Sequence, residues 1–283
     1  MSESTAMAQR PADAKLPTIA VLGGSGREGG GLAFRWAHAG YPVVIGSRDP
    51  ARAVTAAAAL NDELNRAALS AVSLNDELNR AVPGGVHSDP APAPAGRADA
   101  PATRPLATQH HAVVGTSQRE AAAAAEIVVF AVPYSAQMPL ADEVADLLAG
   151  KIVVDVTVPL VPPRVDRVQL PAGGSAVQAL QDRLGQAVRV ISAFQNISAT
   201  HLRDPHYVID CDVLVCGDDA DARQVVIDLA AAAGLAAWHA GPLANSVATE
   251  ALTSLLIAIN KRYKVPASGI RITGVPGRDA RKA

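Results

Sequence analysis

The sequence has few cysteines, no excess of charge of either sign, and no apolar run long enough to cross a membrane. Its two cysteines, Cys211 and Cys216, stand five residues apart, which fits neither a CxxC pair nor a disulfide framework. The 25 basic and 27 acidic residues leave a formal charge of −2, whereas a dedicated nucleic-acid-binding protein usually has a basic excess. Glu126 interrupts the longest Ala- and Val-rich run. We therefore expect a cytoplasmic protein that binds neither nucleic acid nor membrane.

The chain also lacks the residue patterns of the common hydrolytic and metal sites. It contains no G-x-S-x-G nucleophile elbow, and His201, His206 and His239 have no Cys, Asp or Glu at the spacing of a zinc site. We expect no metal and no catalytic acid or base. A direct hydride transfer between two bound cofactors needs neither, because the protein has only to position two rings and exclude water.

The chain does have enough apolar sequence for a folded core, since 49% of its 283 residues are apolar and 18% are charged. Short apolar runs alternate with helical segments, a pattern typical of an α/β protein with a doubly wound parallel sheet. The expected strands are 18–22, 42–45, 127–132, 151–156, 188–193 and 211–216. The expected helices are 31–38, one that starts near Pro50, 135–148, 219–233 and 246–263.

Residues 61–110 are expected to form an insertion. The octapeptide LNDELNRA occurs at 60–67 and again at 74–81. The offset is close to four helical turns, so both copies would present the same face of one continuous helix. The stretch that follows is rich in Pro, Ala, Gly and Asp and is expected to be flexible. A local duplication that lengthens a surface helix explains the repeat most simply.

The Pro-rich segment 158–163 indicates a boundary between two domains. We expect a dinucleotide-binding domain followed by a second, smaller C-terminal α/β domain that closes a cleft over it. A disordered leader and a basic tail would flank the two domains. The expected divisions are a leader at 1–16, domains at 17–157 and 158–275, and a tail at 276–283.

A glycine-rich turn follows the first expected strand and opens a helix. Gly24, Gly26 and Gly29 fit the spacing G-x-G-x-x-G in the context where this motif binds a dinucleotide. The glycines let the backbone turn tightly and approach a pyrophosphate, and the helix N-terminus offers free N–H groups to its oxygens. The sequence therefore predicts a Rossmann-type dinucleotide site.

The end of the second expected strand indicates which dinucleotide binds. NAD sites usually carry Asp or Glu there for the ribose 2′-hydroxyl, whereas this chain has Ser47 and Arg48, with Arg52 one turn later. A hydroxyl and two guanidinium groups suit a 2′-phosphate and would favour NADP by about two orders of magnitude. Two alternatives stay open. The two arginines are exposed residues at a helix start and bind no ligand, or Asp49 binds the ribose.

Two further segments follow strands whose carboxyl ends should form the cleft. Val132 and Pro133 are expected beside the nicotinamide, together with Gly46. A later segment offers amides and a hydroxyl that suit hydrogen bonding to a heterocyclic ring. This segment consists of Gln195, Asn196, Ile197 and Ser198. Its Asn and Ser residues also suit turn and helix-cap positions.

Seven stretches of the chain form a distinctive set. They are GGSGREGGGLAFRWAHAG (23–40), IGSR (45–48), AVPY (131–134), DVTVPL (155–160), DCDVLVCGDD (210–219), AGPL (240–243) and LLIAINKRYKV (255–265). Together they resemble the NADPH-dependent coenzyme F420 reductase family, over about residues 17–275 apart from the insertion. The resemblance implies reversible hydride transfer between NADP(H) and coenzyme F420, directly from ring to ring, in a cleft between two domains.

The resemblance also implies roles for single residues. Ser25 would bind the 2′-phosphate together with Ser47, Arg48 and Arg52. The segment 195–198 would face the deazaflavin ring of coenzyme F420. Family members often carry His where this chain has Gln195, so no proton-donor role is expected at that position. The family is generally homodimeric, and helix 246–263 is the expected dimer element. Arg164 and Arg271 would face the phosphate and polyglutamate of coenzyme F420.

Two other functions fit the same sequence features. An NADPH-dependent reductase of an imine, ketone, flavin or ferric chelate would have the same dinucleotide site. For an imine or a ketone, the sequence offers only Tyr134 or Thr157 as a proton donor. A non-catalytic NADP sensor would bind the dinucleotide tightly without turnover.

Overall fold

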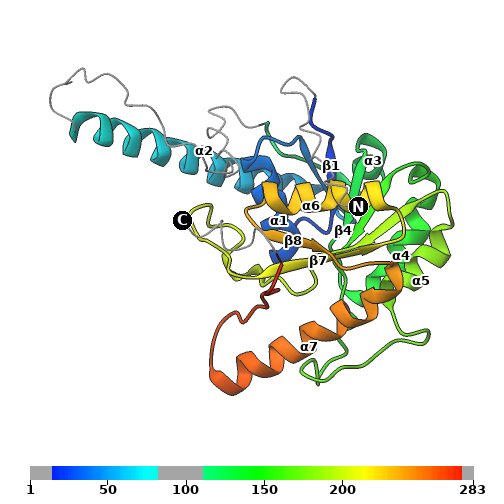
Figure 1. Ribbon diagram of the computed structural model, residues 1–283. Helices are drawn as coiled ribbons and strands as arrows, with labels where there is room; N and C mark the ends of the chain where they lie inside the picture. Colours follow the sequence, from blue (N-terminus) through cyan, green and yellow to red (C-terminus); the bar gives the residue numbers. More distant parts are fainter. Residues whose placement is uncertain (1–14, 82–110, 276–283) are drawn as a thin grey trace, which may run out of the picture.

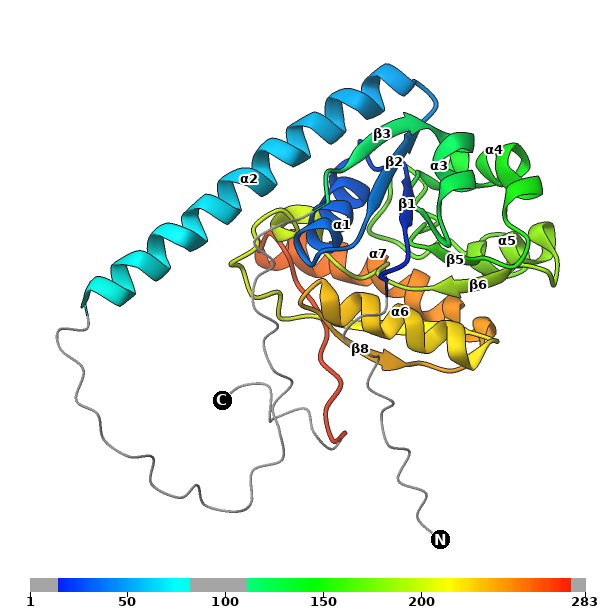
Figure 2. The ribbon, with the colours of Figure 1, turned by 90° about the horizontal axis from the view of Figure 1, so that it is seen from above.

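The computed structural model describes residues 15–81 and 111–275. In this part of the chain, strands form one sheet in the order β3-β2-β1-β4-β5-β6-β7-β8 (Figures 1 and 2). They are β1 (Ile19–Leu22), β2 (Val43–Ser47), β3 (Val114–Ser117), β4 (Ile127–Phe130), β5 (Ile152–Asp155), β6 (Arg189–Ser192), β7 (Asp212–Gly217) and β8 (Ala236–His239). Neighbouring strands are parallel except β6 and β7, which are antiparallel. The expected Rossmann-type α/β sheet is confirmed.

Helices cover both faces of this sheet (Figure 2). They are α1 (Arg27–His38), α2 (Pro50–Ala81), α3 (Gln118–Ala124), α4 (Tyr134–Val144), α5 (Ala176–Leu184), α6 (Ala220–Ala232) and α7 (Ser246–Tyr263). Along β1, Ile19 and Val21 join the apolar layer that contains α1, α2 and α6, while Ala20 and Leu22 join the layer with α3 and α4. A strand buried on both faces reads as a continuous apolar run, which is why β1 was predictable.

Four elements were not among the expected ones: β3, α3, α5 and β8. The strands β3 and β8 form the two edges of the sheet, and most of their residues are partly exposed. An edge strand therefore lacks the continuous apolar run that marked β1, β4 and β5. Several boundaries also shift: α1 begins at Arg27, β2 continues to Ser47, β4 ends at Phe130 and α4 ends at Val144.

The second half of the chain extends the same sheet. β6 pairs with β5 in parallel, from Ile152 against Arg189 to Asp155 against Ser192, and β7 and β8 follow beyond it. The Pro-rich segment 158–163 has no regular structure and belongs to the crossing from β5 to α5. The division into two domains stays a prediction. Most of the expected leader and the tail at 276–283 lie outside the described residues.

α2 is one continuous helix through both copies of LNDELNRA, as their offset predicts. Leu60 and Leu64 of the first copy are fully buried, and the side chain of Asn61 exchanges hydrogen bonds of 2.9 and 2.8 Å with the backbone of Val113. α2 therefore packs against the core as far as Leu64, and the insertion expected at about 61–110 stays a prediction. Beyond that point α2 projects from the sheet (Figure 2). Residues 82–110 lie outside the described part.

Replacing Leu64 with Ala tests this packing. Leu64→Ala should lower the free energy of unfolding by about 2–5 kcal/mol, because it leaves a cavity in the core. Leu69 lies on the same helix with 68% of its surface exposed. Leu69→Ala should therefore change stability by less than about 0.5 kcal/mol. Urea titrations followed by circular dichroism measure both values, and equal losses in the two variants would contradict the burial of Leu64.

Candidate active site

The turn between β1 and α1 is packed against the neighbouring strand β4. Gly23 has a φ of +91°, and a Cβ there would lie 2.3 Å from the carbonyl oxygen of Ala131. A Cβ at Gly29 would lie 2.9 Å from the Ala131 Cβ. The N-cap of α1 is Gly26, which has no side chain to accept hydrogen bonds from the first N–H groups of the helix. The start of α1 thus keeps its N–H groups for an anionic ligand.

The end of β2 places a hydroxyl and two guanidinium groups close together in the chain. Ser47 is buried, and its hydroxyl accepts a hydrogen bond from the Asp49 amide at 3.2 Å. The Asp49 carboxylate accepts from the amides of Ala51 (3.0 Å) and Arg52 (3.4 Å), so it caps α2. Asp49 is therefore occupied as a helix cap. This occupation weakens the alternative in which Asp49 binds a ribose.

Arg48 and Arg52 are both exposed, and neither makes an ion pair within the described residues. Ser25 lies half-buried in the glycine turn itself. Charged groups at a helix start that have no protein partner are available to a ligand of opposite charge. The geometry is consistent with the anion site that the sequence predicts here.

The ends of β4 and β5 form the next part of this edge. Val132 is half-buried, and Pro133 is exposed as the N-cap of α4. Thr157 is buried, and its hydroxyl lies 3.5 Å from the Val132 carbonyl oxygen.

Asp155 is a residue of this edge to which the sequence assigned no role. Its carboxyl group is fully buried at the end of β5, where the Gln137 side-chain amide and the Thr157 backbone N–H (2.9 Å) donate to it. Burial raises the pKa of Asp155 to about 6, and these hydrogen bonds oppose the increase. Its only sequence signal was a position at the end of an apolar strand.

Glu28, in the first turn of α1, was likewise assigned no role. Burial of its carboxyl group, with the nearby charge of Asp155, raises the pKa of Glu28 to about 8. Glu28 is therefore mostly protonated at neutral pH. As a result the N-terminus of α1 lacks a negative charge that would repel an anion.

The predicted segment 195–198 does not act as one unit. The Gln195 side-chain nitrogen donates to the Asp155 carbonyl and the Ser192 hydroxyl, both at 2.8 Å. These two contacts orient the amide and leave the Gln195 Oε1 buried without a partner in the described residues. Gln195 thus joins β6 to the edge that contains Asp155.

The other members of the segment serve the fold. Asn196 donates to the Asp212 carbonyl at 2.7 Å, and Ser198 accepts from the Thr200 amide as the N-cap of the short helix η2 (Ala199–His201). Ile197 is buried in the apolar layer with α1. Asn196 and Ser198 therefore occupy the turn and cap roles that the sequence left open.

α7 covers this edge with its polar face. The Thr253 hydroxyl donates to the Gln195 carbonyl at 2.8 Å. The buried Glu250 accepts from the Ser175 hydroxyl at 2.6 Å and from two amides at the start of α5, while burial raises the pKa of Glu250. These contacts fix α7 beside the ends of β5 and β6. The edge therefore has a hydrogen-bonding wall without a strong acid at its surface.

Arg164 and Arg271, which were expected to face coenzyme F420, differ in their surroundings. Arg271 forms an ion pair with Asp210, and its Nε lies 2.6 Å from the carboxylate. Arg164 is exposed and makes no ion pair in the described parts of the chain. Within residues 15–81 and 111–275, no group of three or more His, Cys, Asp or Glu residues is arranged to hold a metal ion.

Comparisons with known proteins give three similarities. The family described as NADP oxidoreductase, coenzyme F420-dependent, matches residues 18–90 and 95–159. The F420-dependent NADP reductase of Methanocaldococcus jannaschii is 33% identical over 91% of this chain and 98% of its own length, and that of Methanothermobacter thermautotrophicus is 35% identical over 91% and 95%. A crystal structure of a candidate F420-dependent NADP reductase from Arthrobacter sp. FB24 aligns with a TM-score of 0.63 at 24% identity, covering 91% of this chain and 100% of that one.

The pKa of Glu28 predicts how stability depends on pH. The free energy of unfolding should fall as the pH rises from about 4.5 to 8, because the folded state holds the Glu28 proton more tightly than the unfolded state. Glu28→Gln has no such proton and should flatten this decline, which urea titrations at several pH values would measure. Asp155 is present in both the parent protein and the Glu28→Gln variant. The difference between their two pH profiles therefore reports the contribution of Glu28. Identical pH profiles would mean that Glu28 ionises normally.

Proposed function

The chain belongs to the coenzyme F420-dependent NADP oxidoreductase family, and from this we propose how its residues serve the family's reaction. The enzyme transfers a hydride between NADP(H) and coenzyme F420. In one direction NADPH, a proton and oxidised F420 give NADP⁺ and reduced F420. The observation that carries this function is the 33–35% identity to three F420-dependent NADP reductases over 91% of the chain.

We propose that the NADP end of the site is the edge formed by β1 and β2. Gly24, Gly26 and Gly29 would admit the pyrophosphate, and the open N-terminus of α1 would bind its oxygens. The residues proposed for the 2′-phosphate are Ser25, Ser47, Arg48 and Arg52. Two observations support this: the arginines have no ion pair within the described residues, and the adjacent carboxylate of Asp49 caps α2.

The reacting rings would meet at the ends of β4, β5 and β6. Val132 and Pro133 would flank the nicotinamide, and the turn Gln195–Ser198 would face the deazaflavin. Gln195 is the member whose side chain reaches the β5 end, while Asn196 and Ser198 would keep the shape of the turn. Bound side by side, the two cofactors supply the hydride donor and acceptor. The protein orients the rings and excludes water.

No side chain of the site is needed as a general acid or base for the hydride step itself. Gln195 has no dissociable proton, and its amide nitrogen is held by Asp155 and Ser192. Glu28, neutral below about pH 8, would leave the phosphate end of the site without a repelling charge. The three relatives that match this chain over 91% of its length are all F420-dependent NADP reductases, so we propose neither the alternative acceptors nor the sensor function.

We also propose that α7 forms a homodimer interface. Four of its polar residues are buried, whereas Leu255, Ile259 and Tyr263 are 53%, 41% and 71% exposed. The buried four are Ser246, Thr249, Glu250 and Ser254. Leu243–Tyr263, which includes η3 (Leu243–Asn245) and α7, is long and apolar enough to cross a membrane by length and composition alone. Its polar face is already bound to α5 and β6, so a second copy of the chain is the cover that we propose.

The proposed location is the cytoplasm. Cys211 and Cys216 are free and buried, and burial raises the pKa of both thiols. Unpaired thiols are typical of a reducing compartment.

A turnover assay tests the function. Purified protein should bleach the visible absorbance of oxidised F420 rapidly with NADPH and slowly with NADH, because NADH lacks the 2′-phosphate. Bleaching with neither dinucleotide, while NADPH still binds, would contradict F420 as the acceptor.

Arg48→Ala tests the 2′-phosphate site in the same assay. The loss of one charge-assisted contact should raise the KM for NADPH by about 10- to 100-fold and leave the KM for F420 unchanged. Arg183 is exposed on α5, in an ion pair with Asp142, and Arg183→Ala serves as the matched control with both constants unchanged. If both KM values moved in Arg48→Ala, or neither did, the assignment would be wrong.

The dimer is tested by placing a charge on the outer face of α7. Leu255→Glu and Ile259→Glu should each convert a dimer into a monomer, because the interface would have to bury an unpaired carboxylate. Light scattering after size-exclusion chromatography measures the mass. Val208→Glu, at an 83% exposed apolar residue outside α7, should leave the mass unchanged. A parent protein with the mass of one chain would refute the proposal.

A further inference from the structure

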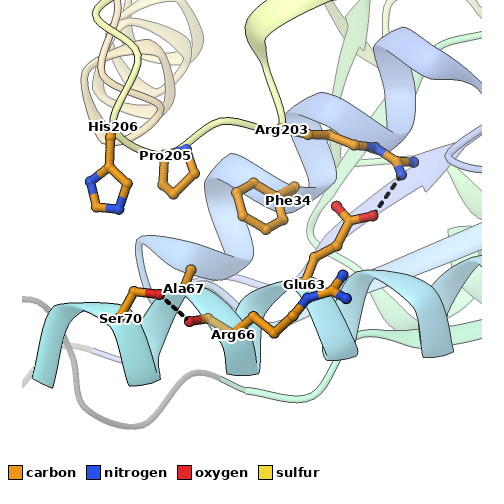
Figure 3. A pocket seen from close by; sticks show the side chains of 8 residues that line it. All are labelled: Phe34, Glu63, Arg66, Ala67, Ser70, Arg203, Pro205 and His206. Carbon is orange, nitrogen blue, oxygen red and sulfur yellow. Dashed lines mark hydrogen bonds and ion pairs between the residues drawn. The ribbon is translucent and has the colours of Figure 1, made fainter. Parts of the chain in front are cut away.

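A pocket separate from the cofactor edge lies between α1, α2 and the residues that follow η2 (Figure 3). We name it the α2 pocket. Its volume is about 340 Å³, which is within the range of small-molecule sites. None of the residues proposed for NADP or F420 lines it. From its walls and its charges we infer that the α2 pocket binds a small organic carboxylate.

One wall of the pocket is held rigidly by a buried arginine. Arg35 of α1 donates from Nε to the Leu202 carbonyl at 2.7 Å and from Nη2 to the carbonyls of His201 (3.0 Å) and Tyr207 (3.1 Å). The rings of His201 and Tyr207 also stack, with centroids 3.8 Å apart. These contacts fix the segment that carries Arg203 and His206. A preformed wall lowers the entropic cost of binding a ligand.

The charges that line the pocket select a monoanion. Arg203 and Glu63 neutralise one another through an ion pair of 3.2 Å. Arg66, one turn further along α2, makes no ion pair in the described parts of the chain. One guanidinium group is thus left for a ligand, and its planar fork matches a carboxylate. A phosphate dianion would bring more negative charge than the single free guanidinium could balance.

Apolar groups line the same pocket and favour a ligand with an apolar body. Ala67 of α2 and the ring of Pro205 lie around the opening between the helix and the fixed wall, and the ring of Phe34, only 1% exposed, lies behind them (Figure 3). The imidazole of His206 stands beside Pro205 and can hydrogen-bond to a carboxylate oxygen. An apolar surface with a few polar groups at one side is the usual make-up of a small-molecule site.

The position of Arg203 depends on a glycine of α1. A Cβ at Gly30 would lie 2.6 Å from the Arg203 Nη2, so only glycine lets the guanidinium group lie against the first turn of the helix. Arg203 is thereby held where it meets Glu63. This arrangement keeps Glu63 paired, which leaves the Arg66 guanidinium free for a ligand.

Benzoate is the probe that tests the site, with benzamide as its neutral counterpart of the same shape. Titrations by ligand-observed NMR use the full chain saturated with NADP. The dinucleotide then occupies Arg48 and Arg52, so benzoate cannot bind there. Benzoate should bind in the millimolar range, and benzamide at least about tenfold more weakly. Equal binding of benzoate and benzamide would overturn the carboxylate assignment.

Two variants locate the binding. Arg66→Gln should weaken benzoate binding at least about tenfold. Arg80 holds the equivalent place in the second octapeptide, so Arg80→Gln is the matched control and should leave binding unchanged. Ala67→Trp, which fills the pocket without changing its charge, should abolish binding. Benzoate that fails to bind, or that binds Arg66→Gln as tightly as the parent, would refute the site without affecting the F420 reaction.

Discussion

One buried residue at the end of β5, Asp155, joins the strand ends of the candidate site through its carboxyl group and its backbone carbonyl. Asp155 has no solvent contact, and such burial is tolerated because Gln137 and the Thr157 amide donate to its oxygens. Its own carbonyl accepts from Gln195 at 2.8 Å, and Gln195 in turn accepts from Thr253 of α7. One residue therefore connects α4, β5, β6 and α7. Removing it would leave buried amide groups without partners on two neighbouring elements.

The fold was predictable where burial is complete and not where it is partial. β1, β4 and β5 are buried on both faces, and their continuous apolar runs identified them in the sequence. β3 and β8 are edge strands of four residues with partly exposed side chains, so no period or run marked them. The second-half strands β6 and β7 were found, but their antiparallel pairing depends on contacts that no local pattern encodes.

In the candidate site, residues in short local patterns were predictable from the sequence, whereas residues that depend on distant contacts were not. The glycine turn and the pair Ser47 and Arg48 were found because each is a short pattern next to a strand. Asp49 was ambiguous, since the same carboxylate could bind a ribose or cap α2, and only the geometry assigns it to the cap. Arg271 was expected to meet a ligand, yet its nearest anion is Asp210, 61 residues earlier in the chain. Pairs so distant in sequence are invisible to spacing arguments.

α7 reverses the usual rule that a surface helix turns its apolar face inward. Thr249, Glu250 and Ser254 are almost completely buried, whereas Leu255 and Ile259 are exposed. The inward polar face has a clear purpose: Glu250 caps α5 and Thr253 holds the Gln195 carbonyl, so the helix serves as a hydrogen-bonding wall at the ends of β5 and β6. Among the large apolar residues of α7, Leu256 is buried on this side, whereas Leu255 and Ile259 are not. Leu255 and Ile259 therefore stay exposed within the described residues, and the proposed homodimer would bury them.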